Sequence, residues 1–183
     1  METVPFIIRD RKIRIAVLGC GRISKNHLNA IAQHQEDFEL VGVCDTDSQI
    51  LAQASAEYKT TGYATLEDLL TKSNADVVSI CTPSGLHPRQ AIEIAAAGKH
   101  VISEKPMATR WHEGLEMVRA CEDAGVRLFV VKQNRRNATL QLLKKAIDNK
   151  RFGRIYMVSV NVFWTRPQSY YDQGKWRYSK GVR

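Results

Sequence analysis

The 183-residue sequence lacks the marks of several specialised protein classes. Its four cysteines, Cys20, Cys44, Cys81 and Cys121, form no CxxC pair, which argues against a zinc site or disulfide framework and favours buried free thiols. No apolar stretch approaches the roughly 20 residues that cross a bilayer. The N-terminus also has no apolar segment followed by a small-residue cleavage site. We therefore expect a cytoplasmic protein with no membrane segment, no signal peptide and no metal.

Repeats and low-complexity segments are also lacking, and acidic residues are scarce at one end. The composition, 44% hydrophobic and 25% charged, is ordinary for a globular protein. Residues 1–126 hold 13 Lys and Arg against 17 Asp and Glu, whereas residues 127–183 hold 14 against 2. This basic second part requires a separate explanation.

Short apolar runs alternate with helical patterns up to about residue 132. Six short strands with helical crossovers predict an α/β fold, a Rossmann-like doubly wound parallel sheet. The expected strands are Ile13–Leu18, Leu40–Cys44, a short one at Tyr63, Val77–Cys81, His100–Ser103 and Arg127–Val131. The expected helices are Ile23–His34, one capped by Asp47 or Ser48, one from Thr65, residues 86–97 and Thr109–Ala124.

The pattern changes after this sheet. Ala138–Asn149 reads as an amphipathic helix, and the alternation in Arg154–Thr165 predicts a long strand. One helix and one strand cannot form an independent domain, because a lone strand leaves its backbone groups unpaired. We therefore expect a nucleotide-binding domain over residues 1–132 and the truncated start of a second, α+β domain over residues 133–183.

A glycine turn follows the first strand, in the sequence Gly19-Cys20-Gly21-Arg22-Ile23-Ser24. Gly19 permits the tight turn, and Gly21 lets the backbone approach a pyrophosphate at the N-terminus of the next helix. Ser24 stands where the usual fingerprint has a third glycine, and its small side chain still allows close packing. The turn predicts dinucleotide binding.

Asp45 ends the second strand, where a carboxylate can accept both ribose hydroxyls of adenosine. It would repel a 2′-phosphate, and neither Thr46 nor Asp47 supplies a counter-charge. These residues favour NAD over NADP. The alternative is that Asp45 is only a turn residue.

The loop from Cys81 to His87 follows the fourth strand, at the carboxyl edge where ligands bind in such sheets. Its candidate cofactor-binding residues are Thr82, Pro83, Leu86 and His87. The alternative is a plain strand-to-helix turn, with Ser84 as a cap and His87 as an ordinary helix residue.

Glu104-Lys105-Pro106 at the end of the fifth strand completes a set of motifs. In order, GCGRIS, TPSGLH, EKPMA and QNRRN resemble the Gfo/Idh/MocA family of oxidoreductases over about residues 12–165. Within it, the stretch from Gln133 through NVFWTRPQSYYDQGKW is similar to dehydrogenases of UDP-N-acetylglucosaminuronate-type sugars in lipopolysaccharide O-antigen synthesis.

The resemblance implies hydride transfer from C3 of the sugar to NAD, with Lys105 as the catalytic residue beside the reacting hydroxyl. It implies a cis peptide before Pro106. It places Glu104 near the nicotinamide ribose, and Asn134 and Arg135 where cofactor and substrate meet. The alternatives are a solvated Lys105 and a solvated Arg135–Arg136 pair.

A small-molecule sugar nucleotide with a diphosphate and a carboxylate would explain the basic second part. Nucleic acid is the rival explanation, but no nucleic-acid motif is present. A third explanation is an acidic segment absent from this chain.

Relatives of this type are about twice as long, and their second domain presents an Asp and a His opposite the lysine. Nothing in residues 138–183 supplies that pair. The alternative function is therefore a catalytically silent NAD-binding module. The family's homo-oligomers form through the sheet of that second domain.

Overall fold

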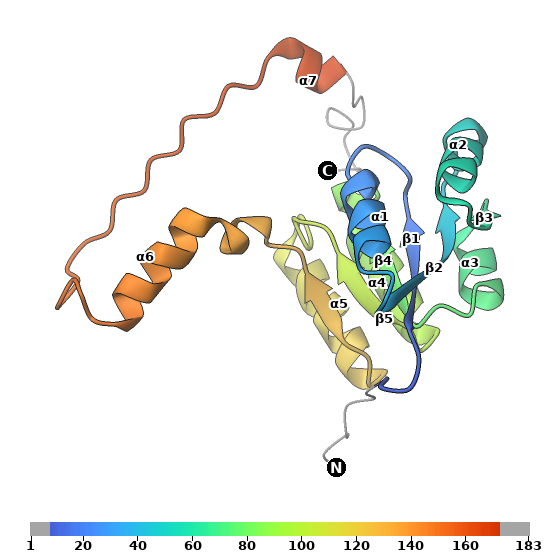
Figure 1. The fold of residues 1–183 in the computed structure, drawn as a ribbon, viewed down its shortest axis with the longest axis horizontal. Helices are drawn as coiled ribbons and strands as arrows, with labels where there is room; N and C mark the ends of the chain where they lie inside the picture. The colour runs from blue at the N-terminus through green and yellow to red at the C-terminus, as the bar shows by residue number, and fades with distance from the viewer. Residues whose placement is uncertain (1–7, 173–183) are drawn as a thin grey trace.

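The computed structural model describes residues 8–172 and centres on a six-stranded parallel sheet with strand order β3-β2-β1-β4-β5-β6. The strands are β1 (Ile13–Leu18), β2 (Phe38–Cys44), β3 (Gly62–Tyr63), β4 (Val77–Ile80), β5 (His100–Ser103) and β6 (Leu128–Val130). The chain builds outward from β1 to β3, then returns to β4 and builds the other way (Figure 1). This reversal confirms the predicted doubly wound sheet and creates a crevice at the carboxyl ends of β1 and β4.

Five helices connect these strands, close to the predicted positions. They are α1 (Ser24–Gln33), α2 (Ser48–Tyr58), α3 (Leu66–Lys72), α4 (His87–Ala96, after a 3₁₀ turn at Ser84–Leu86) and α5 (Trp111–Asp123). Asp47 caps α2 by accepting from the backbone N–H groups of Gln49 and Ile50 at 2.9 and 3.1 Å. Thr65 caps α3 in the same way, so local capping chemistry sets where both helices begin.

Alternate residues of the central strands supply two hydrophobic cores, one on each face of the sheet. Ile15 and Val17 of β1 face the core that includes residues of α1 and α2. Ala16 and Leu18 face the core that includes residues of α3, α4 and α5. All four are at most 5% exposed, which explains why β1 is an unbroken apolar run apart from its start.

Beyond β6 the chain leaves the sheet. A 3₁₀ turn, η2 (Gln133–Arg136), leads into α6 (Ala138–Asp148), and an extended segment then returns to α7 (Gln168–Asp172) near the start of α1 (Figure 1). The predicted apolar stripe of α6, Leu140, Leu143 and Ile147, is more than 40% exposed. Nothing in the described part of the chain is long and apolar enough to be a membrane-spanning helix.

The strand predicted at Arg154–Thr165 does not form, and that prediction is wrong for the described chain. Residues 154–167 pair with none of the six strands. Tyr156, Met157 and Phe163 are 84, 85 and 91% exposed. A strand needs a neighbour to satisfy its backbone N–H and C=O groups, and no described strand lies alongside this segment. The rest of the predicted second domain, residues 173–183, lies outside the described residues.

Candidate active site

A cleft of about 1160 Å³ runs along the carboxyl edge of the sheet. It extends from Asp45 and Thr46 after β2, past the glycine turn, to the loops that follow β4 and β5. The fold thus brings together residues that are far apart in the sequence. All the predicted cofactor-binding residues except Asn134 line it, namely Gly19, Gly21, Arg22, Ile23, Asp45, Thr82, Pro83, Leu86, His87, Glu104 and Lys105.

The two glycines of the turn meet different steric demands. Gly19 has φ +91°, and a Cβ there would lie 2.9 Å from backbone atoms of Cys81 and Thr82, so a larger residue does not fit. A Cβ on Gly21 would meet nothing within 4 Å, which leaves open space beside the start of α1. That helix begins with neither a side-chain cap nor an acidic residue in its first turn, so its positive end is available to an anion.

Asp45 is held in place by two backbone hydrogen bonds. Its Oδ2 accepts from the N–H of Cys20 at 2.7 Å, and its Oδ1 accepts from the N–H of Asp47 at 2.9 Å. The carboxylate is therefore tied to the glycine turn at the mouth of the cleft, and each oxygen keeps a further lone pair for a ligand hydroxyl. This position is compatible with the predicted ribose contact.

Glu104 anchors a polar network that sequence reasoning found only in part. Its Oε1 lies 2.8 Å from Nε2 of His27, and its Oε2 accepts from the N–H of Lys105 at 3.1 Å. The other ring nitrogen of His27 lies 2.9 Å from Oγ of Ser79. Burial raises the pKa of the Glu104 carboxyl, but the hydrogen bonds from His27 and Lys105 outweigh it and hold that pKa below its ordinary value.

His27 and Ser79 were not among the predicted site residues. The one sequence signal for His27 is its place in the first turn of α1, beside Leu28, which is 1% exposed. Ser79 sits in the apolar run of β4, where nothing in the sequence sets its hydroxyl apart from a core serine. Both residues join the site because β4 and β5 are neighbours in the sheet and because α1 packs beside them.

His87 is buried, at 1% exposed, although it belongs to the cleft wall. Its Nδ1 lies 2.9 Å from the carbonyl oxygen of Pro106, and its Nε2 lies 2.8 Å from the carbonyl oxygen of Thr82. Both nitrogens thus face backbone carbonyls, and the one that carries the proton donates to its carbonyl. His87 shapes the wall and has no ring nitrogen left to hydrogen-bond a ligand in this arrangement.

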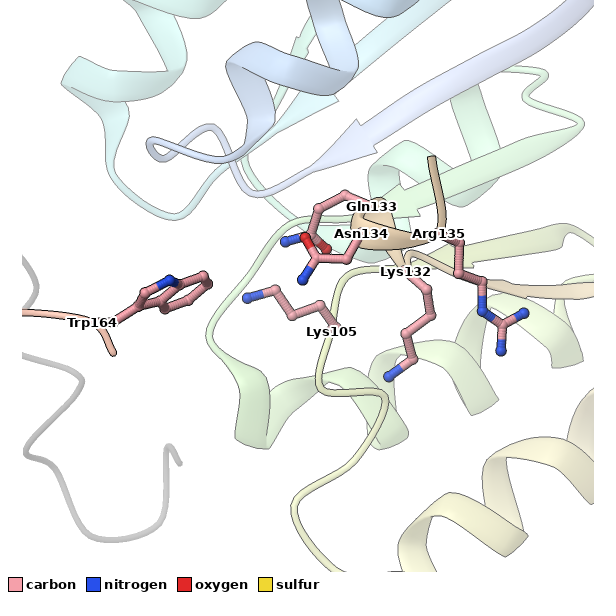
Figure 2. A pocket seen from close by; sticks show the side chains of 6 residues that line it. All are labelled: Lys105, Lys132, Gln133, Asn134, Arg135 and Trp164. Atoms are coloured by element: carbon pink, nitrogen blue, oxygen red, sulfur yellow. The ribbon is translucent and has the colours of Figure 1, made fainter. Parts of the chain in front are cut away.

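Lys105 stands between the cleft and a second cavity of about 300 Å³. Within the described chain it is the one residue that lines both. Figure 2 shows Asn134 and Trp164 on the side to which Lys105 points, while Arg135 points away from it. The peptide before Pro106 is cis, as the family resemblance implies. The second cavity is lined by Lys105, Lys132, Gln133, Asn134, Arg135 and Trp164.

The last described helix reaches the cleft from outside the sheet. Tyr170 of α7 lines the cleft, and the Arg22 guanidinium lies 5.5 Å from the centre of its ring. Arg166 lies 5.0 Å from the same ring and 4.6 Å from that of Trp164. Sequence reasoning did not single out Tyr170, because its place depends on the path of residues 149–167.

The cysteines near the cleft are free and buried. Burial, with the nearby Asp45 carboxylate, raises the pKa of Cys20 to about 12 and that of Cys44 to about 11. Burial likewise raises the pKa of Cys81 to about 12. Thiols in this state are poor nucleophiles. Between residues 8 and 172, no group of three or more His, Cys, Asp or Glu side chains is arranged to hold a metal ion.

Curated relatives of the chain include sugar and polyol dehydrogenases. It is 33% identical over 145 residues to the D-apiose dehydrogenase of Paraburkholderia graminis, covering 78% of this chain and 38% of that protein. It is 32% identical over 152 residues to the inositol 2-dehydrogenase of Rhizobium meliloti, covering 81% and 44%. The chain therefore spans less than half the length of these relatives.

Solved structures give higher identities. The WlbA dehydrogenase from Bordetella pertussis, in complex with NADH and UDP-GlcNAcA, is 64% identical with a TM-score of 0.91, over 94% of this chain and 52% of that one. WlbA from Chromobacterium violaceum, with the same two ligands, is 59% identical with a TM-score of 0.92, over 97% and 51%. Residues 13–132 match the model of an oxidoreductase family with an NAD-binding Rossmann fold. By this match, its six-stranded sheet and its glycine turn, the chain belongs to the Gfo/Idh/MocA oxidoreductase family.

Proposed function

We propose that this chain supplies the cofactor site and the catalytic lysine of an NAD-dependent dehydrogenase. Its substrate is a UDP-N-acetylglucosaminuronate-type sugar oxidised at C3, a step of lipopolysaccharide O-antigen sugar synthesis in the cytoplasm. The observation that carries the proposal is the position of Lys105, between the dinucleotide-sized cleft and a second cavity lined by several lysine and arginine residues. The two WlbA dehydrogenases, similar over nearly the whole chain, support the choice of sugar.

The residues of the cleft fit NAD. The open space at Gly21 and the uncapped start of α1 suit a pyrophosphate. The Asp45 carboxylate suits two ribose hydroxyls and disfavours a 2′-phosphate. Glu104 and the Thr82 loop form the opposite end of the cleft, where the nicotinamide would lie.

Bound NAD would supply the acceptor for a hydride from the sugar carbon. Lys105 would take the proton that leaves the sugar hydroxyl, while the hydride would go to the cofactor. Asn134 would hold the sugar near both groups, and Lys132 and Arg135 would attract its negative charges. Each of these roles belongs to the proposal.

We also propose a domain boundary after residue 132 and homo-oligomer formation through a second-domain sheet. The boundary is supported by β6, which ends at Val130, and by α6, whose main contacts are with η2. All five histidines precede residue 138, so residues 138–183 offer no Asp/His pair. This observation favours the second candidate, an NAD-binding module without turnover.

Titration with NADH and then with UDP-GlcNAcA tests the proposal. We expect the purified chain to bind NADH, seen as a change in nicotinamide fluorescence, and to bind the sugar nucleotide more tightly once NADH is present. Lys105→Met should leave NADH affinity within about twofold and weaken UDP-GlcNAcA binding about tenfold. Lys144→Met, on the exposed face of α6, is the matched control and should change neither.

Turnover separates the two candidates. We expect little or no NADH from the chain when it is given NAD and UDP-GlcNAcA. Robust substrate-dependent NADH production would refute the silent module and support the dehydrogenase. Failure to bind NADH at all would refute both.

A further inference from the structure

Two buried histidines hold the turn that carries Lys105, one on each side. His27 of α1 contacts the Glu104 carboxylate at 2.8 Å, and His87 of α4 contacts the Pro106 carbonyl at 2.9 Å. The Glu104 carboxylate in turn accepts from the backbone N–H of Lys105. The backbone on both sides of Lys105 is therefore fixed by a histidine from a different helix.

The second ring nitrogen of each histidine lies beside a residue at the end of β4, and as a neutral ring His27 can accept from a hydroxyl there while donating to Glu104, whereas His87 faces two carbonyls and donates to one of them. His27 reaches Ser79 Oγ at 2.9 Å, and His87 reaches the Thr82 carbonyl at 2.8 Å. Each ring is thus a bridge between the carboxyl end of β4 and the turn after β5. These bridges lie at one end of the cleft, whereas Asp45 and Gly21 lie towards the other.

The residues that hold the Lys105 turn are largely buried. The side chains of His27 and Glu104 are 13 and 9% exposed, and His87 is 1% exposed. A buried polar group that loses its partner is left unpaired at a cost in stability, so a shift of the turn would be opposed by the loss of these hydrogen bonds. The Lys105 side chain itself is exposed, and its direction depends on the backbone that carries it.

We propose that His27 and His87 are positioning residues that set the nicotinamide end of the cleft and the direction of Lys105. This inference rests on the proposed function. It predicts that loss of either ring disturbs the nicotinamide end alone, because the glycine turn and Asp45 have their own backbone supports. The role of both histidines follows from their contacts with the protein, at Glu104, Ser79, Pro106 and Thr82.

Two ligands that differ only in the nicotinamide test this inference. Under the proposed function NADH would occupy both ends of the cleft, whereas ADP-ribose lacks the nicotinamide ring. We expect His27→Gln and His87→Gln each to weaken NADH binding about tenfold and ADP-ribose binding less than twofold. His112→Gln, an exposed residue at the start of α5, is the control and should change neither affinity.

The inference would be overturned if the variants did not distinguish the two ligands, or if wild-type chain bound neither. An equal loss for both ligands would mean a general structural role, and no loss for either would mean that the bridges do not matter. If wild-type chain binds neither ligand, the proposed function fails together with the inference. If wild-type binds both and the variants do not discriminate, the inference alone fails.

Two further measurements keep the inference testable if the histidine variants fail to fold: a milder variant, Ser79→Ala, and an experiment on the wild-type chain. Ser79→Ala removes only the hydroxyl that contacts His27. It should weaken NADH binding about threefold more than ADP-ribose binding. In wild-type chain, ring N–H protons of His27 and His87 should exchange with solvent more slowly than those of His112, as followed by NMR. Equal exchange rates for all three histidines would overturn the inference.

Discussion

At the scale of single residues, the backbone holds the Asp45 carboxylate in one place at the mouth of the cleft. Two backbone N–H groups, from Cys20 and Asp47, fix both of its oxygens. The carboxylate is thereby fixed beside the glycine turn, where a second phosphate on the adenosine ribose would meet its negative charge. Under the proposed function, we therefore expect discrimination against NADP to depend on the charge of Asp45 and not on its shape.

Asp45→Asn tests this assignment with little change of volume. We expect the ratio of NAD to NADP affinities to fall at least about tenfold, because the amide removes the charge that repels the 2′-phosphate. Calorimetric titration with both cofactors measures the ratio. The Asp148→Asn variant, on the exposed face of α6, should leave it unchanged. An unaltered ratio in Asp45→Asn would contradict the role given to Asp45.

At the scale of elements, one carboxylate joins the amino ends of β1 and β4, at the edge of the sheet opposite the cleft. Asp76, just before β4, accepts from the N–H of Arg14 at 2.9 Å and forms ion pairs with Arg11 at 2.6 Å and Arg14 at 3.0 Å. Burial raises the pKa of Asp76, but the hydrogen bonds from the two arginines outweigh it and hold that pKa well below its ordinary value. The start of β1 is thus joined to the start of β4.

Asp76→Asn should lower the free energy of unfolding at pH 7 by about 1–3 kcal/mol. Because the folded-state pKa is depressed, this stabilisation is present above the unfolded pKa, near about 4, and is lost as the pH falls through the folded pKa. Urea unfolding at pH 7 and pH 3 should therefore show a smaller difference from wild type at pH 3. A difference of the same size at both pH values would contradict this account.

At the scale of the whole molecule, the sheet and the segment after it differ in how they bury apolar surface. The sheet has a closed core on each face, whereas α6 and residues 154–164 expose large apolar side chains, among them Leu142, Met157 and Phe163. Contiguous exposed apolar surface promotes association in water. The nucleotide cleft depends mainly on the sheet, with Tyr170 as one contact from the later segment.

A chain that ends after Asn137 should therefore be more soluble and still bind NADH. We expect a narrower sedimentation distribution than for residues 1–183 and an NADH affinity within about threefold, with the loss of Tyr170 as the main change. Analytical ultracentrifugation and fluorescence titration measure the two properties. Lower solubility of the shorter chain would mean that residues 138–172 pack on the sheet more firmly than their exposure indicates.

The nucleotide-binding domain was predictable from the sequence because its signals are local. The apolar run of β1, the glycine turn, the cap predicted at Asp47 or Ser48 and the helix start predicted at Thr65 each depend on a few neighbouring residues. The structure forms the strand and the turn, and it places the caps at Asp47 and Thr65. The cleft residues were also predictable, since the ends of parallel strands meet at one edge. The role predicted for Lys105, by contrast, came only from the resemblance of its motif to the family.

Only the tertiary structure determined the features that need a contact between residues far apart in the sequence. His27 and Ser79 joined Glu104 only through the neighbouring positions of β4 and β5 and the packing of α1. The alternation in Arg154–Thr165 predicted a strand, but a strand exists only where another strand takes its hydrogen bonds, and the described chain brings none. Sequence pattern thus determined which elements the sheet contains, while long-range contacts determined what surrounds Lys105.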